Sequence, residues 1–333
     1  MKQRVVITHW VHDEVISFLE QSCEVVPNES RQSLSGAEIL RRTREADGVM
    51  VFMPDIIDDD FLSACPHLKI VSAAFKGYDN VDVESCTRRG IWFTIVPDLL
   101  TIPTAELAVG LLLGLTRRML DGDRFVRTGC FTGWRPELYG SGLAGRCAGI
   151  VGMGAVGQAI AKRLSGFEMA LLYTDSVGLS EDREKMWGLS RLPLDDLLAR
   201  SDYVLLSVPL TPDTFHLIDE NGLSKMKPGS FLVNVCRGSV VNEESVAAAV
   251  ASGHLAGYAA DVFELEDRAR RDRPSVISAS LLRKTSATFL TPHLGSAVDY
   301  VRREISLEAA RNILQAFQGL RPQGAINQLQ VEV

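Results

Sequence analysis

Ala148-Gly149-Ile150-Val151-Gly152-Met153-Gly154-Ala155-Val156-Gly157 is the stretch of this 333-residue sequence that says most about its fold. Residues 148–151 have the pattern of a buried strand, and residues 158–166 have the pattern of a helix. The G-x-G-x-x-G between them permits a tight turn, a close approach of the backbone to a pyrophosphate, and close helix–strand packing. Because a helix N-terminus attracts phosphate, this stretch predicts a dinucleotide site.

Asp175 follows the next predicted strand, residues 170–174, and stands eighteen positions after Gly157. An acidic side chain at this point can accept hydrogen bonds from both hydroxyls of an adenosine ribose, and it would repel a 2′-phosphate. The following residue is Ser176 and not an arginine. The sequence therefore favours NAD over NADP. An unrelated glycine turn beside a surface aspartate is the alternative.

The composition is that of an ordinary globular protein. There are 42 acidic and 35 basic residues, which gives a net charge of −7, and 46% of the positions are hydrophobic. Such a chain can form two domains with substantial cores. Nucleic acids and anionic membranes usually bind basic faces, so we expect neither as a partner. The longest apolar run, Leu107–Leu115, has about half the length that a bilayer crossing needs.

The cysteines and the N-terminal sequence point to one compartment. The six cysteines, at positions 23, 65, 86, 130, 147 and 236, form no CxxC pair and have no metal-ligand spacing. We interpret them as free thiols in a reducing environment, the alternative being a disulfide framework. His9 and Asp13 come too early to leave room for the apolar region of a signal peptide. We therefore expect a cytoplasmic protein, and no metal is predicted.

Short apolar runs alternate with helical patterns along most of the chain, as is typical of open parallel α/β sheets. Residues 123–147 lack periodicity and are predicted to form an ordered loop. Strands are expected over residues 4–8, 48–53, 69–74, 148–151, 170–174, 203–208, 230–234, 257–262 and 288–290, and helices over 13–20, 105–120, 158–166 and 302–317.

Beyond the glycine motif, the chain resembles the D-2-hydroxyacid dehydrogenase superfamily from end to end. The matching segments are Gly77-Tyr78-Asp79-Asn80-Val81-Asp82, Thr104-Ala105-Glu106, Val208-Pro209-Leu210, Asn234-Val235-Cys236-Arg237-Gly238, Asp261-Val262-Phe263 through Glu266, and Thr291-Pro292-His293. The resemblance implies an α/β fold with two doubly wound parallel-sheet domains. A flavodoxin-like split substrate domain would comprise residues 1–100 plus 298–333, and a Rossmann-type NAD-binding domain residues 101–297. It also implies an active site in the cleft between them and a homodimer.

The catalytic roles implied by the resemblance fit the chemistry of three residues. Arg237 offers a planar fork of donors that suits two oxygens of an oxyanion. His293 can exchange a proton near neutral pH, and the negative charge of Glu266 would orient the ring and favour its protonated form. Taken singly, each residue could instead be structural. Cofactor contacts carried over in the same way are Thr104, Val208, Pro209, Val235, Cys236, Asp261 and Gly295. We interpret the Cys236 side chain as a small packing group and not as a nucleophile.

Within the superfamily the chain looks most like the phosphonate (phosphite) dehydrogenases. Phosphite is a compact dianion with little apolar surface, so its binding must be electrostatic. Lys76 and Arg302 would join Arg237 around it, while Met53, Trp134 and Tyr139 would limit the size of the site. The segments that carry this likeness are Phe52-Met53-Pro54-Asp55, Lys76-Gly77, Val96-Pro97-Asp98-Leu99-Leu100-Thr101, Trp134, Tyr139, Gly257-Tyr258-Ala259-Ala260-Asp261 and Arg302.

The sequence thus predicts NAD-dependent oxidation of phosphite to phosphate, with water as the nucleophile and His293 accepting its proton. The nearest alternative is a 2-hydroxyacid dehydrogenase that acts on glyoxylate, hydroxypyruvate or a similar oxoacid. A redox-sensing corepressor is a third interpretation. It is disfavoured because the chain ends at Val333, soon after the last predicted helix, and leaves little room for disordered tails.

Overall fold

The computed structural model describes residues 2–283 and 286–329. The chain forms two compact units. Unit 1 comprises Met1–Leu100 together with Ala297–Val333, and unit 2 comprises Thr101–Ser296. Residues 330–333, which the sequence assigns to the split substrate domain, lie outside the described residues.

Unit 1 is built on a parallel five-stranded sheet with the order β2-β1-β3-β4-β5, which is the doubly wound order of flavodoxin-like folds. Its strands are β1 (Arg4–Ile7), β2 (Glu24–Val26), β3 (Gly48–Val51), β4 (Ile70–Ala73) and β5 (Trp92–Thr94). Its helices are α1 (Asp13–Glu20), α2 (Gly36–Thr43), α3 (Asp59–Ser63), α4 (Val83–Arg88) and α13 (Asp299–Phe317). Ser35, Asp58 and Asp82 cap α2, α3 and α4 by accepting a backbone N–H of the first turn.

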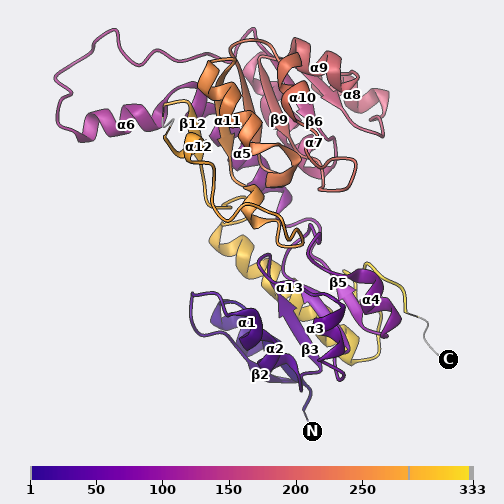
Figure 1. The fold of residues 1–333 in the computed structure, drawn as a ribbon. Coiled ribbons are helices and arrows are strands. Elements are labelled where there is room, and N and C mark those ends of the chain that lie inside the picture. The colour runs from indigo at the N-terminus through magenta and orange to yellow at the C-terminus, as the bar shows by residue number, and fades with distance from the viewer. Residues whose placement is uncertain (1, 284–285, 330–333) are drawn as a thin grey trace. The chain divides into compact units, whose positions relative to one another are not determined.

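The C-terminal helix α13 belongs to the core of unit 1, although some two hundred residues separate it in sequence from β5. Ile305, Ala309 and Ile313 are fully buried and pack with apolar residues of β1, β3 and β4. The hydroxyl of Ser72 in β4 donates to the carbonyl of Ala309 at 2.9 Å. Figure 1 shows α13 lying among the elements of the N-terminal segment. Unit 1 is therefore discontinuous in sequence because its core includes this C-terminal helix.

Unit 2 is built on a parallel seven-stranded sheet with the order β12-β11-β10-β9-β6-β7-β8. Its strands are β6 (Cys147–Val151), β7 (Ala170–Thr174), β8 (Leu189–Arg191), β9 (Tyr203–Leu206), β10 (Ser230–Asn234), β11 (Leu255–Ala260) and β12 (Thr288–Leu290). Its helices are α5 (Thr101–Thr116), α6 (Met119–Arg127), α7 (Ala155–Leu164), α8 (Glu181–Trp187), α9 (Leu194–Arg200), α10 (Glu220–Lys225), α11 (Glu243–Ser252) and α12 (Ala279–Arg283). Numbered from its own first strand, this order contains the 3-2-1-4-5-6 arrangement of Rossmann folds.

The predicted fold class of two doubly wound parallel-sheet units is confirmed, but two local predictions are wrong. The helix expected over residues 105–120 ends at Thr116, because Arg118 has a left-handed backbone with φ of 53°. Part of the loop expected over residues 123–147 is helical, since α6 continues to Arg127. Figure 1 shows α6 standing out from the rest of unit 2.

We expect Ile305→Ala to lower the free energy of unfolding by about 2–5 kcal/mol, as for other large-to-small substitutions in a closely packed core. Ile305 is fully buried in the core of unit 1, so the substitution removes apolar contacts and leaves a cavity. Chemical denaturation followed by circular dichroism measures the change. Arg311→Ala is the control, because the Arg311 side chain lies on the same helix and is 52% exposed. Equal stability of the two variants would contradict the packing described for α13.

Candidate active site

Arg237, Glu266 and His293 follow three neighbouring strands of the unit 2 sheet. Arg237 comes after β10, Glu266 after β11 and His293 after β12, and these strands are adjacent and parallel. The carboxyl ends of parallel strands meet at one edge of a sheet, and ligands of open α/β folds bind at this edge. The topology therefore brings the three predicted catalytic residues to the same edge.

His293 and Glu266 form a direct pair, with 2.6 Å between Nδ1 of the ring and Oε2 of the carboxylate. The other carboxylate oxygen accepts the backbone N–H of Phe263 at 2.8 Å. This hydrogen bond orients the Glu266 side chain independently of its contact with the His293 ring. His293 has a left-handed backbone, with φ of 56°. This conformation is uncommon for residues other than glycine and is concentrated at functional sites. The pair can thus hold the ring in one orientation with Nε2 available for chemistry.

Asp261 fixes the loop that carries His293. One of its oxygens accepts the Thr291 hydroxyl and the Leu294 backbone N–H, each at 2.6 Å, and the other accepts the Gly295 N–H at 2.8 Å. Burial raises the pKa of Asp261, and these hydrogen bonds oppose the rise. The Asp261 carboxylate, which was predicted to contact the cofactor, is therefore engaged with its own chain, and the cofactor contact stays a prediction.

Arg237 stands in a turn that is closely packed against the segment of Glu266. A Cβ placed on Gly238 would lie 1.9 Å from the backbone carbon of Phe263, so only glycine fits there. The Asn234 side chain, which is fully buried, spans the turn by donating to the Arg237 carbonyl and accepting from the Cys236 N–H. Burial raises the pKa of the Cys236 thiol to about 11. Cys236 is thus a protonated, poorly nucleophilic group at neutral pH.

A buried ionic cluster, which was not predicted from the sequence, includes Glu264 of the short helical turn that carries Glu266. Glu243 and Glu264 are buried, and the backbone N–H of each donates to a carboxylate oxygen of the other, at 2.9 and 2.5 Å. His216 and Arg270 approach the second oxygen of Glu264 at 3.2 and 3.0 Å. Burial raises the pKa of Glu243 to about 7. The cluster ties the start of α11 to the short helical turn Glu264–Glu266.

The glycine motif has the geometry of a phosphate-binding loop. Gly152 has φ of 93°, and a Cβ there would lie 2.8 Å from the backbone of Ser207. At Gly157 a Cβ would lie 2.1 Å from the Gly152 carbonyl oxygen, whereas nothing lies within 4 Å of one at Gly154. Gly154 is thus the position open to an approaching ligand, and it is the N-cap of α7, which makes no side-chain capping bond within the described residues. Backbone N–H groups of this helix end are suited to hold a pyrophosphate.

Asp175 lies at the end of β7, beside the glycine loop. Its carboxylate accepts the backbone N–H of Met153 at 2.6 Å and that of Val177 at 3.0 Å. Partial burial acts to raise the pKa of Asp175, but these hydrogen bonds outweigh it and the pKa lies below its ordinary value. An ionised acceptor at this point fits a ribose diol. The residues present therefore fit NAD.

The other predicted cofactor residues occupy the same edge. The chain order of the sheet reverses between β6 and β9, and doubly wound folds bind nucleotides at such a switch point. Val208 and Pro209 follow β9, and Val235 follows β10. Thr104 faces the loop after β12, since a Cβ on Gly295 would lie 3.2 Å from its hydroxyl oxygen.

In unit 1, Arg302 and Lys76 belong to one neighbourhood. The Arg302 guanidinium donates to the carbonyl of Ala74 at 3.3 Å, two residues before Lys76, and lies 5.7 Å from the centre of the Phe52 ring, next to Met53. Burial lowers the pKa of Arg302. Lys76, Gly77 and Met53 are half-buried.

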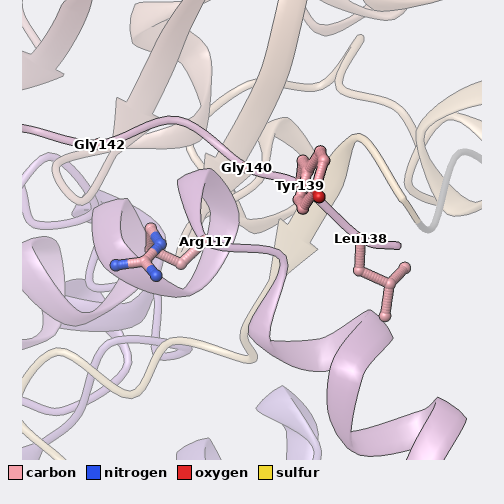
Figure 2. Close-up of a pocket in the computed structure, with 5 residues that line it drawn as sticks. All are labelled: Arg117, Leu138, Tyr139, Gly140 and Gly142. Atoms are coloured by element: carbon pink, nitrogen blue, oxygen red, sulfur yellow. The ribbon is translucent and has the colours of Figure 1, made fainter. Parts of the chain in front are cut away.

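Trp134 and Tyr139 are not part of these clusters. In unit 2 their side chains are 82% and 72% exposed, on the segment that follows α6. Tyr139 lines a pocket together with Arg117, Leu138, Gly140 and Gly142 (Figure 2). This part of the chain is anchored to the end of α5, where Ser141 donates to the Thr116 carbonyl at 2.8 Å. Their predicted role as walls of a substrate site stays a prediction.

Within residues 2–283 and 286–329, no group of three or more His, Cys, Asp or Glu side chains is arranged to hold a metal ion. Nor does any helix in them combine the length and the apolar character that crossing a bilayer requires.

The family of this chain follows from comparison with known proteins. Residues 109–295 match the family "D-isomer specific 2-hydroxyacid dehydrogenase, NAD binding domain". A glyoxylate reductase of Thermococcus onnurineus is 38% identical over 98% of this chain and 96% of its own length, and one of Pyrococcus furiosus is 36% identical over 100% and 98%. A crystal structure of a Thermus thermophilus protein superimposes with a TM-score of 0.88 at 33% identity, covering 98% of this chain and 100% of that one.

The fold and the nucleotide loop are those of a nucleotide-dependent oxidoreductase. The chain belongs to the D-isomer specific 2-hydroxyacid dehydrogenase family, and it is an NAD-dependent oxidoreductase of that family. The prediction of the superfamily is thereby confirmed, whereas the narrower one is not supported: the relatives named above are glyoxylate reductases and not phosphonate dehydrogenases. Of the two substrate predictions, the comparisons favour the 2-hydroxyacid alternative.

We expect Glu243→Gln to stabilise the protein relative to the wild type increasingly as the pH rises. The folded-state pKa of Glu243 is raised from 4.5 to about 7, so folding retains a proton that the unfolded chain loses. The contribution of this proton to the free energy of unfolding is complete below pH 4.5 and is lost as the pH rises to 7. Because the glutamine of the variant does not titrate, the free energy of unfolding of the variant does not fall in this way. Unfolding free energies measured from pH 5 to pH 8 test the trend. Glu244→Gln changes the exposed neighbour and serves as the control; parallel curves for Glu243→Gln and wild type would contradict the burial assignment.

Proposed function

We propose that this protein interconverts a small 2-oxoacid, of the glyoxylate and hydroxypyruvate class, and the corresponding 2-hydroxyacid. The observation that carries this proposal is the pair formed by His293 and Glu266 at 2.6 Å, on the same sheet edge as Arg237 and the glycine loop. Further support comes from the names of the relatives, which are glyoxylate reductases.

His293 is proposed as the proton donor and acceptor. Bound NADH would supply the hydride that reduces the carbonyl carbon. Glu266 holds Nδ1, so Nε2 is the nitrogen that gives a proton to the carbonyl oxygen in reduction and takes it from the hydroxyl in oxidation. The carboxylate also stabilises the imidazolium, because an adjacent negative charge favours the protonated ring.

Arg237 is proposed to bind the substrate carboxylate. A guanidinium can make two parallel hydrogen bonds to two oxygens, and this fixes the plane of a small substrate as well as its charge. Its turn is rigid, since Gly238 packs against the Phe263 backbone and Asn234 bridges the loop. Such rigidity matters because catalysis requires reacting groups to be held in a defined orientation.

Residues of unit 1 are proposed to complete the binding of the anion. Lys76 and Gly77 follow β4 at the carboxyl edge of the unit 1 sheet, and Arg302 reaches the same neighbourhood through Ala74. Met53 follows β3 and would limit substrate size.

We also propose that the protein works as a homodimer in the cytoplasm, with Trp134 and Tyr139 as walls of the substrate site. The free state of all six cysteines supports a reducing compartment.

Phosphite oxidation is the second candidate, and the placement of two cations favours it. Arg302 and Lys76 are both linked to the segment 74–76, and a small dianion needs more positive charge than a monocarboxylate does. In this reaction the P–H bond breaks with transfer of hydride to NAD. A water oxygen bonds to phosphorus, and the proton of that water goes to His293.

We expect the wild-type protein to oxidise NADH in the presence of glyoxylate or hydroxypyruvate, with a change in absorbance at the wavelength of the reduced nicotinamide. Reduction of NAD in the presence of phosphite is measured in parallel. Activity with an oxoacid and none with phosphite supports the first candidate, and the reverse supports the second. Lack of turnover with every member of the panel would overturn both.

The same experiment includes Arg237→Ala and His293→Ala, which we expect to abolish turnover while the fold survives. Arg237→Lys is a stringent companion, since it keeps the charge but not the planar fork. Circular dichroism and NADH binding provide the check on folding. Near-normal kcat in either alanine variant would remove that residue from the mechanism.

Lys76→Ala should raise the KM for phosphite more than that for glyoxylate if two cations serve the dianion.

We expect Asp175→Ala to weaken the preference of the enzyme for NAD over NADP. The substitution removes the acceptor for the ribose hydroxyls and the charge that repels a 2′-phosphate. The ratio of kcat/KM values for the two cofactors measures the effect. Asp182→Ala is the control, because it removes a carboxylate from the first turn of α8 at an exposed position of the same unit. A ratio that stays unchanged in Asp175→Ala would contradict the ribose assignment.

A further inference from the structure

The smaller sheet has a switch point of its own. Its order β2-β1-β3-β4-β5 reverses between β1 and β3, and in doubly wound folds ligands bind outside the carboxyl ends of the two strands at this place. The chain leaves β1 through Thr8 and His9, and it leaves β3 through Phe52 and Met53. Of these four residues, only Met53 was predicted from the sequence to contact the substrate.

A buried carboxylate joins the two strand ends. Asp55 is only 4% exposed, and one of its oxygens accepts the Thr8 hydroxyl at 2.5 Å and the backbone N–H of Phe52 at 2.8 Å. Its other oxygen lies 3.2 Å from Nε2 of His9. Since a buried carboxylate is costly unless it is well hydrogen-bonded, Asp55 holds these groups firmly. The His9 ring is thereby given a defined orientation.

The Phe52 ring stands in contact with His9 and with Arg302. The centres of the His9 and Phe52 rings are 5.2 Å apart in a tilted arrangement. The Arg302 guanidinium lies 5.7 Å from the centre of the Phe52 ring, which is within the range of a cation–π interaction. A chain of contacts therefore runs from Asp55 through His9 and Phe52 to the Arg302 guanidinium.

We propose that His9 is a positioning residue for the anionic substrate: held by Asp55, it fixes the Phe52 ring and through it the Arg302 guanidinium and the adjacent Met53. The inference rests on the proposed function, in which Arg302 and Met53 face the substrate. His9 acts through Phe52 and is not assigned a proton transfer.

The physical reason is that the half-buried Arg302 guanidinium must be held in one orientation to bind an anion well. An arginine side chain has many rotamers, and each immobilised side chain of this kind costs conformational entropy when the ligand binds. Arg302 is oriented at one end by the Ala74 carbonyl and at its face by Phe52. If the Phe52 ring is free to turn, part of that preorganisation is lost and the substrate binds more weakly.

The test uses His9→Gln, which can still donate from its Nε2 to Asp55 but lacks the ring that packs on Phe52. We expect the KM for the substrate of the wild type to rise about fivefold, the loss that corresponds to one partly exposed cation–π contact. The value of kcat and the NADH affinity should change less than twofold. Phe52→Leu should raise the KM to a similar extent, and the double variant should show less than the product of the two effects, because both act on one contact chain.

His67→Gln is the matched control. His67 also pairs with a carboxylate in unit 1, Glu45 at 3.6 Å, but both side chains are largely exposed. Its KM should equal that of the wild type. Thermal unfolding of every variant separates a loss of fold from a loss of positioning, and the latter appears as a raised KM at unchanged unfolding temperature.

A second readout does not depend on turnover. The Nε–H signal of Arg302 in a nitrogen–proton spectrum, assigned with Arg302→Lys, lies in the field of the Phe52 ring and should move in His9→Gln but not in His67→Gln. An unchanged KM together with an unmoved signal would overturn the inference. If the wild type turns over none of the substrates, the proposed function fails, and the Arg302 signal alone then decides whether His9 sets the cation.

Discussion

Parallel pairing of β10, β11 and β12 is the constraint on which the site depends. Because all three strands run in the same direction, the chain leaves them at one edge, and the side chains of Arg237, Glu266 and His293 share it. An antiparallel β11 would send Glu266 to the opposite edge. The chemistry therefore requires the crossover helices, which return the chain to the start of each next strand.

Three aspartates accept backbone N–H groups at the ends of strands in the two units. Asp175 after β7 accepts the Met153 N–H, Asp261 after β11 accepts the Leu294 and Gly295 N–H groups, and Asp55 after β3 accepts the Phe52 N–H. In each case a carboxylate, with four acceptor positions, satisfies backbone donors that the end of a strand leaves unpaired. The loops at the ligand edges are thereby held by charge-assisted hydrogen bonds in addition to apolar packing.

Much of this arrangement could be predicted from the sequence. The glycine motif is local in sequence, and glycine was expected there because a side chain would not fit. The structure agrees at Gly152 and Gly157, where a Cβ would clash with neighbouring backbone atoms. Alternating apolar runs predict open parallel α/β sheets, whereas the arrangement in two domains with a split first domain was implied by the family resemblance. The ionic cluster of Glu243, Glu264 and Arg270 could not be predicted, since its members come from separate segments and look like ordinary surface charges. Arg118 was also missed, because a left-handed residue leaves no trace in the pattern of apolar positions.

Substrate choice is a question about local charge in a protein whose net charge is −7. The acidic excess does not exclude an anion, because fields between charges more than about 10 Å apart are largely screened at physiological salt. The choice of substrate depends on how many cationic side chains are held close to the site and on how rigidly they are held. Under the proposed function, Arg237 would bind one carboxylate. Arg302 on α13, which lies against the Phe52 ring and donates to the Ala74 carbonyl close to Lys76, would add positive charge for a dianion. The reduction of a carbonyl and the oxidation of phosphorus would then differ in the oxygen that exchanges a proton with His293, that of the substrate or that of water.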